Sequence, residues 1–473
     1  MAHHAQNAIP NITHIPLPVV IIGAGPVGLA AAAHALEEGL EPIVFEAGKT
    51  VADSINDWGH VRLFSPWRFN INAAARRLLE TNGWSQPDPD DLPTGHELVS
   101  RYLQPLAEHP LIAGRLKLNA RVVSVTRQGR DKVISQGRTD HPFLVRVHLA
   151  DGTQLDVEAA AVIDASGTWK TPNPIGDGGI EAMGEAAARD HIHYGIPDVL
   201  GRAKHRYSGR TTLVVGAGHS AANALLDLAA LAEDDPATKI VWAVRGNNLA
   251  RVFGGGDNDQ LPARGALGDR LKALTERGAL TLITNFSVTK FSTAAHPRLT
   301  VTGGTPSGER HLTDIDEVIA ATGQRPDLDM IREVRTDLNS ALESVRDLAP
   351  LIDPNVHSCG TIRPHGAREL TQPEPGFFIV GMKSYGRAPT FLMTTGYEQV
   401  RSIFAALVGD HTRANTVQLA LPETGVCSSS IPGVVCCEGG KDTPINEFAD
   451  PPEPAAPAAA PETANAANCG CGC

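Results

Sequence analysis

Two short apolar runs are each followed by a glycine-rich turn and then by an alanine- and leucine-rich stretch. The first such segment covers residues 17–36, with its turn at 23–28, and the second covers 211–231, with its turn at 216–221. Short continuous apolar runs predict buried strands, and the stretches of strong helix formers predict helices. Both segments therefore predict the order strand, turn, helix.

The two turns carry the small residues that a dinucleotide site requires. Small residues at this spacing let the backbone turn tightly and approach a pyrophosphate, which meets the unpaired N–H groups at the start of the helix. The predicted cofactor-binding residues are Gly23, Gly25, Pro26 and Gly28 in the first turn, and Gly216, Gly218, His219, Ser220 and Ala221 in the second. The chain is therefore expected to bind two dinucleotides.

The strand after each turn indicates which dinucleotide is bound. Glu46 ends the apolar stretch after the first turn, where a carboxylate can accept hydrogen bonds from ribose hydroxyls, as FAD would require. Arg245 takes the matching place after the second turn. A guanidinium there favours a 2′-phosphate and therefore NADPH, although Arg245 could also be an ordinary solvated residue at a strand end.

Composition limits the class of protein. The chain has 473 residues, 42% of them hydrophobic, which is enough for two or three packed domains. Its formal net charge of -12, without a basic stripe, argues against nucleic acid as a partner. Residues 17–36 form the longest apolar stretch, but glycines and Pro26 interrupt it. We therefore expect a cytoplasmic protein with neither a membrane span nor a signal peptide.

Residues 17–410 resemble the flavoproteins with two dinucleotide-binding domains, and among them the flavin-containing and N-hydroxylating monooxygenases. Besides the two turns, the resemblance rests on small-residue segments at 165–167 and 321–323, each after an apolar strand, and on residues 375–391. It implies an α/β fold with two Rossmann-like domains, for FAD and NADP, of three-layer ββα architecture. A disordered cysteine-rich C-terminal tail would follow them.

The resemblance also implies a discontinuous domain order. The first segment of the FAD-binding domain would cover residues 17–168, and the NADP-binding domain would be inserted as residues 169–319. The FAD-binding domain would be completed by residues 320–412. Residues 413–473 would form the flexible tail, because their proline- and alanine-rich part cannot bury a core.

Further site residues follow from the same resemblance. The additional residues expected near the cofactors are Arg62, Val123, Ala165, Gly167, Gly323, Gly381 and Met382. Arg62 and Asn70 lie in a segment that resembles the one passing the flavin ring, and with Arg387 they are the catalytic candidates; an ordinary packed loop is the alternative for that segment. The family usually has an acid after the glycine at 381, but Met382 and Lys383 follow here. Backbone N–H groups are therefore expected to contact the flavin.

Six of the seven cysteines lie in the last 47 residues. Clustered thiols outside a core are typical of redox or metal chemistry in the cytosol, and Cys427, Cys436 and Cys437 could supply three thiolates to a soft ion. The alternative is a tail whose thiols are incidental. A flavoprotein body with such a tail is similar to the flavin monooxygenases of bacterial arsenic resistance, which implies a trivalent metalloid as partner.

These observations together predict an enzyme, an NADPH- and FAD-dependent monooxygenase that uses O2 on a small, soft nucleophilic substrate, with an arsenical as the specific candidate. A disulfide or metalloid reductase that uses the tail thiols is the first alternative, and a metalloid-sequestering protein is the second. No cysteine precedes Cys359, so a reductase would depend on the tail. A homodimer is left open.

Overall fold

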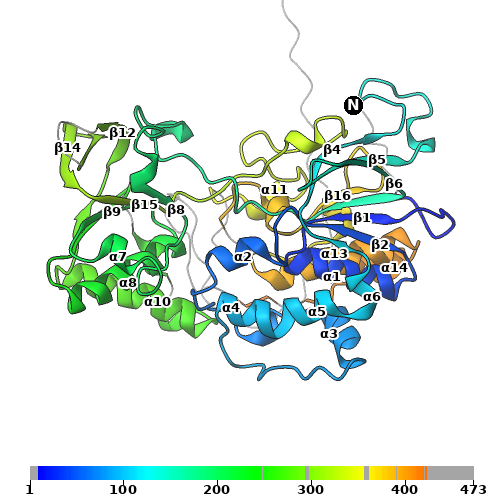
Figure 1. Cartoon of the computed structure of the whole chain (residues 1–473), viewed down its shortest axis with the longest axis horizontal. Coiled ribbons are helices and arrows are strands. Elements are labelled where there is room, and N and C mark those ends of the chain that lie inside the picture. Colours follow the sequence, from blue (N-terminus) through cyan, green and yellow to red (C-terminus); the bar gives the residue numbers. More distant parts are fainter. Residues whose placement is uncertain are drawn as a thin grey trace, which may run out of the picture. The chain divides into compact units, whose positions relative to one another are not determined.

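The computed structural model describes residues 9–247, 249–254, 256–292, 298–355, 362–389, 391–419 and 421–422. They form two parallel sheets, each with helices on one face and a three-stranded antiparallel sheet on the other (Figure 1). This arrangement confirms the predicted α/β class, with two Rossmann-like units of three-layer ββα architecture. Residues 423–473, most of the predicted tail, lie outside the described part of the chain.

The first parallel sheet has the strand order β16-β7-β1-β2-β3. Its strands are β1 (Val19–Ile22), β2 (Pro42–Phe45), β3 (Leu116–Lys117), β7 (Ala161–Asp164) and β16 (Phe377–Ile379). Strand β1 pairs with β7 and with β2, so that Ile22 lies between Asp164 and Phe45 at the carboxyl edge of the sheet. Strand β16 pairs with β7, although all strands of the second sheet lie between the two along the chain.

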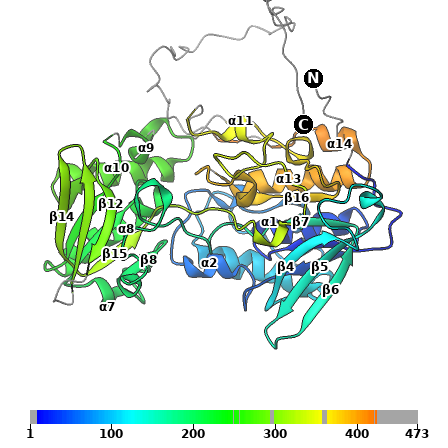
Figure 2. The ribbon, with the colours of Figure 1, turned by 90° about the horizontal axis from the view of Figure 1, so that it is seen from above.

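One face of this sheet is covered by helices, and the other by strands β4 (Ala120–Arg127), β5 (Phe143–Leu149) and β6 (Gln154–Ala159) (Figure 2). The main helices are α1 (Pro26–Glu37), α3 (Ala73–Glu80) and α13 (Met393–Leu407). Most of α1 is buried, including all its alanines. Helix α1 packs against both the sheet and α13. A helix enclosed in this way needs apolar residues on all of its faces, which explains its run of alanines.

The second parallel sheet has the order β11-β10-β9-β15-β8. Its strands are β8 (Ile192–Tyr194), β9 (Thr211–Val215), β10 (Lys239–Ala243), β11 (Thr281–Ile283) and β15 (Glu317–Ala320). Helices α8 (His219–Asp234) and α10 (Pro262–Glu276) cover one face, and β12 (Ser287–Ser292), β13 (Leu299–Thr305) and β14 (Gly308–Ile315) form the antiparallel layer. The last strand of the second sheet, β15, ends at Ala320, one residue after the predicted end of the NADP-binding domain at residue 319. The domain boundary itself stays a prediction.

Shorter helices complete the described chain. They are α2 (Asp53–Asp57), α4 (Gly95–Leu98), α5 (Gln104–Glu108), α6 (Pro110–Ala113), α7 (Lys204–Tyr207), α9 (Ala250–Phe253), α11 (Ala349–Ile352), α12 (Ala367–Leu370) and α14 (His411–Asn415), with a π-helical turn at Val99–Leu103 and 3-10 turns that include η8 (Gly381–Tyr385). No helix among the described residues is both long and apolar enough to cross a membrane.

The chain crosses between the two sheets twice, and the two crossings pair with each other. The N–H of Asn173 donates to the carbonyl of Gly323 at 2.9 Å, and the N–H of Arg325 donates to that of Thr171 at 3.0 Å. The two small-residue segments that resemble the family pattern therefore lie at the start of each crossing.

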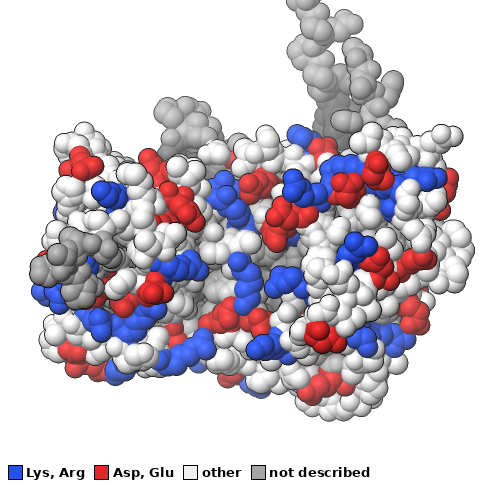
Figure 3. All heavy atoms as spheres, turned by 45° about the horizontal axis from the view of Figure 1, so that its top comes forward, with Lys and Arg blue, Asp and Glu red and all other residues white. Residues whose placement is uncertain are grey.

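Acidic and basic side chains are interspersed over the face of the molecule in Figure 3.

Candidate functional site

The first glycine turn joins β1 to α1, and its glycines serve two purposes. A Cβ on Gly28 would come 1.9 Å from the carbonyl oxygen of Gly23, and a Cβ on Gly23 would come 2.8 Å from that of Ala165. Gly23 also has a φ of 99°, which side chains disfavour. These two glycines are required by the fold itself. A Cβ on Gly25 would meet nothing within 4 Å, so Gly25 borders open space.

The start of α1 is suited to an anion. The helix begins at Pro26, and its N-cap residue Gly25 has no side chain to accept hydrogen bonds. The first N–H groups of a helix have no partner inside the helix, and they carry the positive end of its dipole. Together with the open space at Gly25, these groups fit a pyrophosphate.

Glu46 supports the same turn from the end of β2. Its Oε2 accepts the N–H of Ala24 at 2.7 Å, and its Oε1 accepts the N–H of Gly48 at 2.7 Å. A carboxylate offers about four acceptor positions, so about two remain for ribose hydroxyls. The sequence predicted the ribose contact but could not show that Glu46 also shapes the glycine turn.

The second turn repeats this construction between β9 and α8. Gly216 has a φ of 134°, and a Cβ there would come 2.2 Å from the carbonyl oxygen of Ala321. Gly218 faces open space and gives α8 no side-chain cap. His219 is exposed at the helix start, whereas Ser220 is half-buried and Ala221 is buried. This turn therefore also fits a pyrophosphate.

Arg245 lies two residues after the end of β10, close to the place that Glu46 takes one residue after the end of β2. Strand β10 pairs with β9 as β2 pairs with β1, and Arg245 follows the end of β10 with its side chain exposed. An exposed guanidinium can contact a 2′-phosphate with several donors at once. The geometry is therefore compatible with the predicted preference for NADPH.

Three further predicted contact residues lie at irregular points of the backbone. Gly167 has a φ of 70°, and a Cβ there would meet nothing within 4 Å. Gly323 has a φ of 81° and follows the end of β15. Val123 lies where the register between β4 and β5 shifts, and such a bulge leaves one residue unpaired in the ladder.

Asn70 holds its own loop together. Its Oδ1 accepts the hydroxyl of Ser65 at 2.9 Å, and its Nδ2 donates to the carbonyls of Ser65 and Pro66 at 2.7 and 3.1 Å. The residue is only 1% exposed. These contacts give Asn70 a structural role, in line with the packed-loop interpretation of this segment.

The other two catalytic candidates are exposed. Arg62 donates from Nη1 to the carbonyl of Leu92 at 2.5 Å, and the N–H of Arg387 donates to the carbonyl of Leu342 at 2.7 Å. In the described part of the chain, no hydrogen bond or ion pair joins Arg62, Asn70 and Arg387. Their catalytic role stays a prediction.

One of the backbone N–H groups expected to contact the flavin in the turn after β16 already has a partner within the protein. The N–H of Gly381 donates to Oε1 of Gln399 at 2.7 Å and is therefore occupied, while Met382 is half-buried. Gln399 also contacts the ring of His365, whose pKa is lowered because it is buried. Lys383, which departs from the family pattern, forms a fully buried ion pair with Asp164 at 2.7 Å.

One contact joins the first unit to the glycine turn of the second, and another lies where the chain leaves the first sheet. The ring of Phe64 lies 5.2 Å from the ring of His219, measured between centroids. The indole N–H of Trp169 donates to Asp57 at 3.0 Å, beside an ion pair of Asp57 with Lys170. The segment that includes Phe64 thus reaches the second dinucleotide turn.

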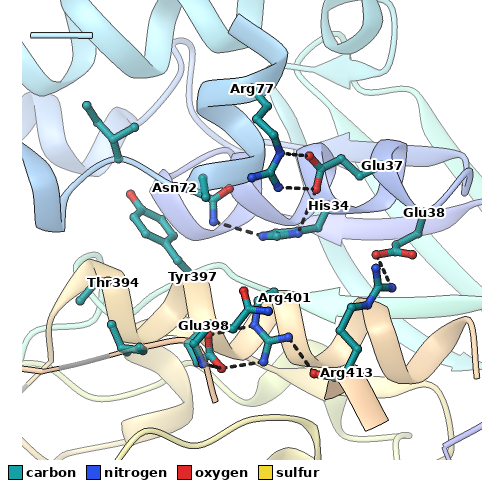
Figure 4. A pocket seen from close by; sticks show the side chains of 14 residues that line it. His34, Glu37, Glu38, Asn72, Arg77, Thr394, Tyr397, Glu398, Arg401 and Arg413 are labelled. Carbon is teal, nitrogen blue, oxygen red and sulfur yellow. Dashed lines mark hydrogen bonds and ion pairs between the residues drawn. The ribbon is translucent and has the colours of Figure 1, made fainter. Parts of the chain in front are cut away.

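A separate polar pocket of about 360 Å³ opens between α1, α3 and α13 (Figure 4). Its charged side chains form the pairs Arg77–Glu37, Arg401–Glu398 and Arg413–Glu38. Burial lowers the pKa of His34 in its wall to about 4, so His34 is neutral. The charges of these three pairs therefore sum to zero.

The predicted soft-ion site of Cys427, Cys436 and Cys437 lies outside the described residues. Within the described ranges, no group of three or more histidine, cysteine, aspartate or glutamate side chains is placed to hold a metal ion. All seven cysteines of the chain fall outside those ranges.

Comparison with known proteins agrees with this geometry. Residues 20–358 match the family model described as pyridine nucleotide-disulphide oxidoreductase. No curated protein matches the chain.

Solved structures of low sequence identity share the fold. Bacillithiol disulfide reductase Bdr from Bacillus cereus is 18% identical, with a TM-score of 0.61, over 84% of this chain and 98% of that one. Ornithine N-hydroxylase from Kutzneria sp. 744, whose structure holds FAD and NADP+, is 15% identical, with a TM-score of 0.53, over 85% of this chain and 100% of that one. Thioredoxin reductase from T. acidophilum is 15% identical, with a TM-score of 0.52, over 84% and 99%.

Proposed function

Since this chain belongs to the pyridine nucleotide-disulphide oxidoreductase family, we propose that it is an NADPH- and FAD-dependent monooxygenase acting on a small, soft nucleophile. The class of enzyme and the two cofactors agree with this family. The observation that carries the choice of a monooxygenase is the pair of open dinucleotide turns in a chain whose first 358 residues contain no cysteine.

The first turn binds FAD in this proposal, and the second binds NADPH. The N–H groups at the start of α1 hold the FAD pyrophosphate, and Glu46 accepts from the adenosine ribose. The start of α8 holds the NADPH pyrophosphate, and Arg245 contacts the 2′-phosphate. Both turns lie at the carboxyl ends of their parallel strands, where ligands of open α/β sheets bind.

When bound, FAD would supply the two-electron chemistry by which NADPH and O2 react, so that the two oxygen atoms divide between substrate and water. One oxygen atom is added to a lone pair of the substrate, and the other leaves as water with two protons. The protein positions the cofactors and excludes water from the site. The segment from Trp58 to Asn70 contributes the wall between the two turns, because its Phe64 contacts His219.

The placement of cysteines favours oxygen transfer over dithiol exchange. Residues 1–358 contain no cysteine, so neither of the two parallel sheets carries a dithiol. The cysteine-rich end of the chain is suited to a thiophilic substrate, because thiolates bind soft ions. We therefore take a trivalent arsenical as the specific candidate substrate.

The test is NADPH-driven oxygen uptake by the purified yellow holoenzyme, with and without arsenite or an organic trivalent arsenical. The proposal expects uptake that rises with substrate and formation of the pentavalent product in equal amount. A variant ending at residue 420 should keep NADPH-dependent flavin reduction. Negligible oxygen uptake with every soft nucleophile tried would contradict the monooxygenase.

The second candidate is a reductase of disulfides or metalloids that uses the C-terminal thiols. The name of the family and the fold shared with a bacillithiol disulfide reductase favour it. It expects disulfide-dependent NADPH oxidation under nitrogen that is lost in the variant ending at residue 420. Arsenite binding without any NADPH oxidation would instead favour a metalloid-sequestering protein.

A further inference from the structure

We propose that the buried ion pair of Lys383 and Asp164 holds together two walls of the flavin site and so positions FAD; this inference rests on the proposed function. Nζ of Lys383 lies 2.7 Å from Oδ2 of Asp164 and donates to Oγ of Ser166 at 3.1 Å. Both charged side chains are 0% exposed. Lys383 and Asp164 would act as positioning residues, without touching the reacting atoms.

The pair joins two backbone turns that both border the first glycine turn. Asp164 ends β7 beside Ile22 of β1, and the next residue, Ala165, is the one whose carbonyl approaches Gly23. Lys383 lies in η8, which begins at Gly381.

That second turn also reaches the start of α1. A Cβ on Gly381 would lie 3.3 Å from a methyl group of Val27, a residue in the first turn of α1. The ion pair therefore links the turn after β7, which contacts Gly23, to the turn after β16, which contacts Val27.

The neighbouring hydrogen bonds make this link rigid. Oδ1 of Asp164 accepts the hydroxyl of Ser166 at 2.7 Å and the N–H of Ser166 at 3.2 Å. The carbonyl of Asp164 accepts the N–H of Val380 at 2.9 Å. Both turns are thus fixed to one carboxylate-bearing residue at the edge of the sheet.

Stability alone does not explain a charged pair in this position. Apolar residues of similar volume are often as stable as a buried ion pair, whereas removal of one partner leaves an unpaired buried charge. What the pair adds is a defined relative position of two turns. It also accounts for two sequence features at once, a lysine after Gly381 and an aspartate before Ala165, which lie 219 residues apart.

The experiment measures FAD binding to the apoprotein by quenching of FAD fluorescence, with the melting temperature recorded in parallel. Lys383→Met and Asp164→Asn are each expected to raise the Kd for FAD by about tenfold or more, because small displacements of a binding wall are costly. In the double variant Lys383→Met/Asp164→Asn no buried charge remains unpaired. Its melting temperature should return toward the wild-type value while its Kd stays raised.

Arg138→Met is the matched control. Arg138 is a buried cation in the same unit, and its partner Glu374 keeps a second arginine, Arg127. This variant should lower the melting temperature and leave the Kd for FAD unchanged. A wild-type Kd in the double variant would overturn the inference, as would an Arg138→Met variant that loses FAD affinity equally. A wild-type apoprotein that does not bind FAD would instead contradict the proposed function.

Discussion

Glu46 accepts the backbone N–H of Ala24 at 2.7 Å, so the end of β2 holds the middle of the glycine turn that follows β1. The same carboxylate accepts the N–H of Gly48 at 2.7 Å. One side chain thereby shapes the turn and keeps acceptor positions for a ribose. The function proposed for Glu46 and its structural role are coupled, and a substitution tests both.

Glu46→Gln should weaken FAD binding by about tenfold. One of the two carboxylate oxygens that accept backbone N–H groups becomes an NH2 group, which cannot accept a hydrogen bond and faces another donor. The measurement is the Kd for FAD of the apoprotein. Glu38→Gln is the control, since it removes only the ion pair with Arg413 at the far end of α1. An unchanged Kd in Glu46→Gln would remove Glu46 from the FAD site.

Gly25→Ala should leave the apoprotein folded but bind FAD poorly. Gly25 has an extended backbone that alanine adopts readily, and its added Cβ would occupy only the space assigned to the pyrophosphate. Gly28→Ala should fail to fold, since its Cβ would overlap the carbonyl of Gly23. Circular dichroism and flavin absorbance of the purified variants separate the two effects. Full flavin content in Gly25→Ala would place the pyrophosphate elsewhere.

Arg245→Ala should raise the KM for NADPH by about 10- to 100-fold, the value of a hydrogen-bonded charge pair, and leave the KM for NADH unchanged. The two constants are measured as initial rates of NAD(P)H oxidation. Arg310→Ala removes an exposed arginine from β14 of the same unit and serves as control. Equal effects on both nucleotides would show that Arg245 does not read the 2′-phosphate.

Stability should fall between pH 6.5 and about 4 through His34, whose pKa burial lowers to about 4. In this range the unfolded chain binds a proton at His34 that the folded chain does not, so the free energy of unfolding decreases as the pH falls. At about 1.4 kcal/mol per pKa unit, the loss reaches about 3 kcal/mol. Urea unfolding at several pH values should show a smaller loss in His34→Gln. Parallel curves for both proteins would refute this assignment.

The two strand–turn–helix segments were predictable because their constraints are local. A short apolar run and closely spaced glycines specify a backbone path within a few residues, and the structure places β1, α1, β9 and α8 there. The hairpin between β5 and β6 has an equally local signal, since Asp151 and Gly152, residues typical of a tight turn, lie between the two strands. Arg62, Asn70 and Arg387 could not be grouped in this way, because their grouping depends on how separate segments pack.

The sequence by itself determined that the chain contains two dinucleotide turns, each between a strand and a helix. Only the tertiary structure decided which partners the individual side chains have. Lys383 forms an ion pair with Asp164, the side-chain amide of Asn70 forms its hydrogen bonds within its own loop, and the ring of Phe64 contacts the ring of His219. The reason is physical. Backbone turns depend on local sterics, whereas the burial and pairing of a side chain depend on segments that come together only when the chain has folded.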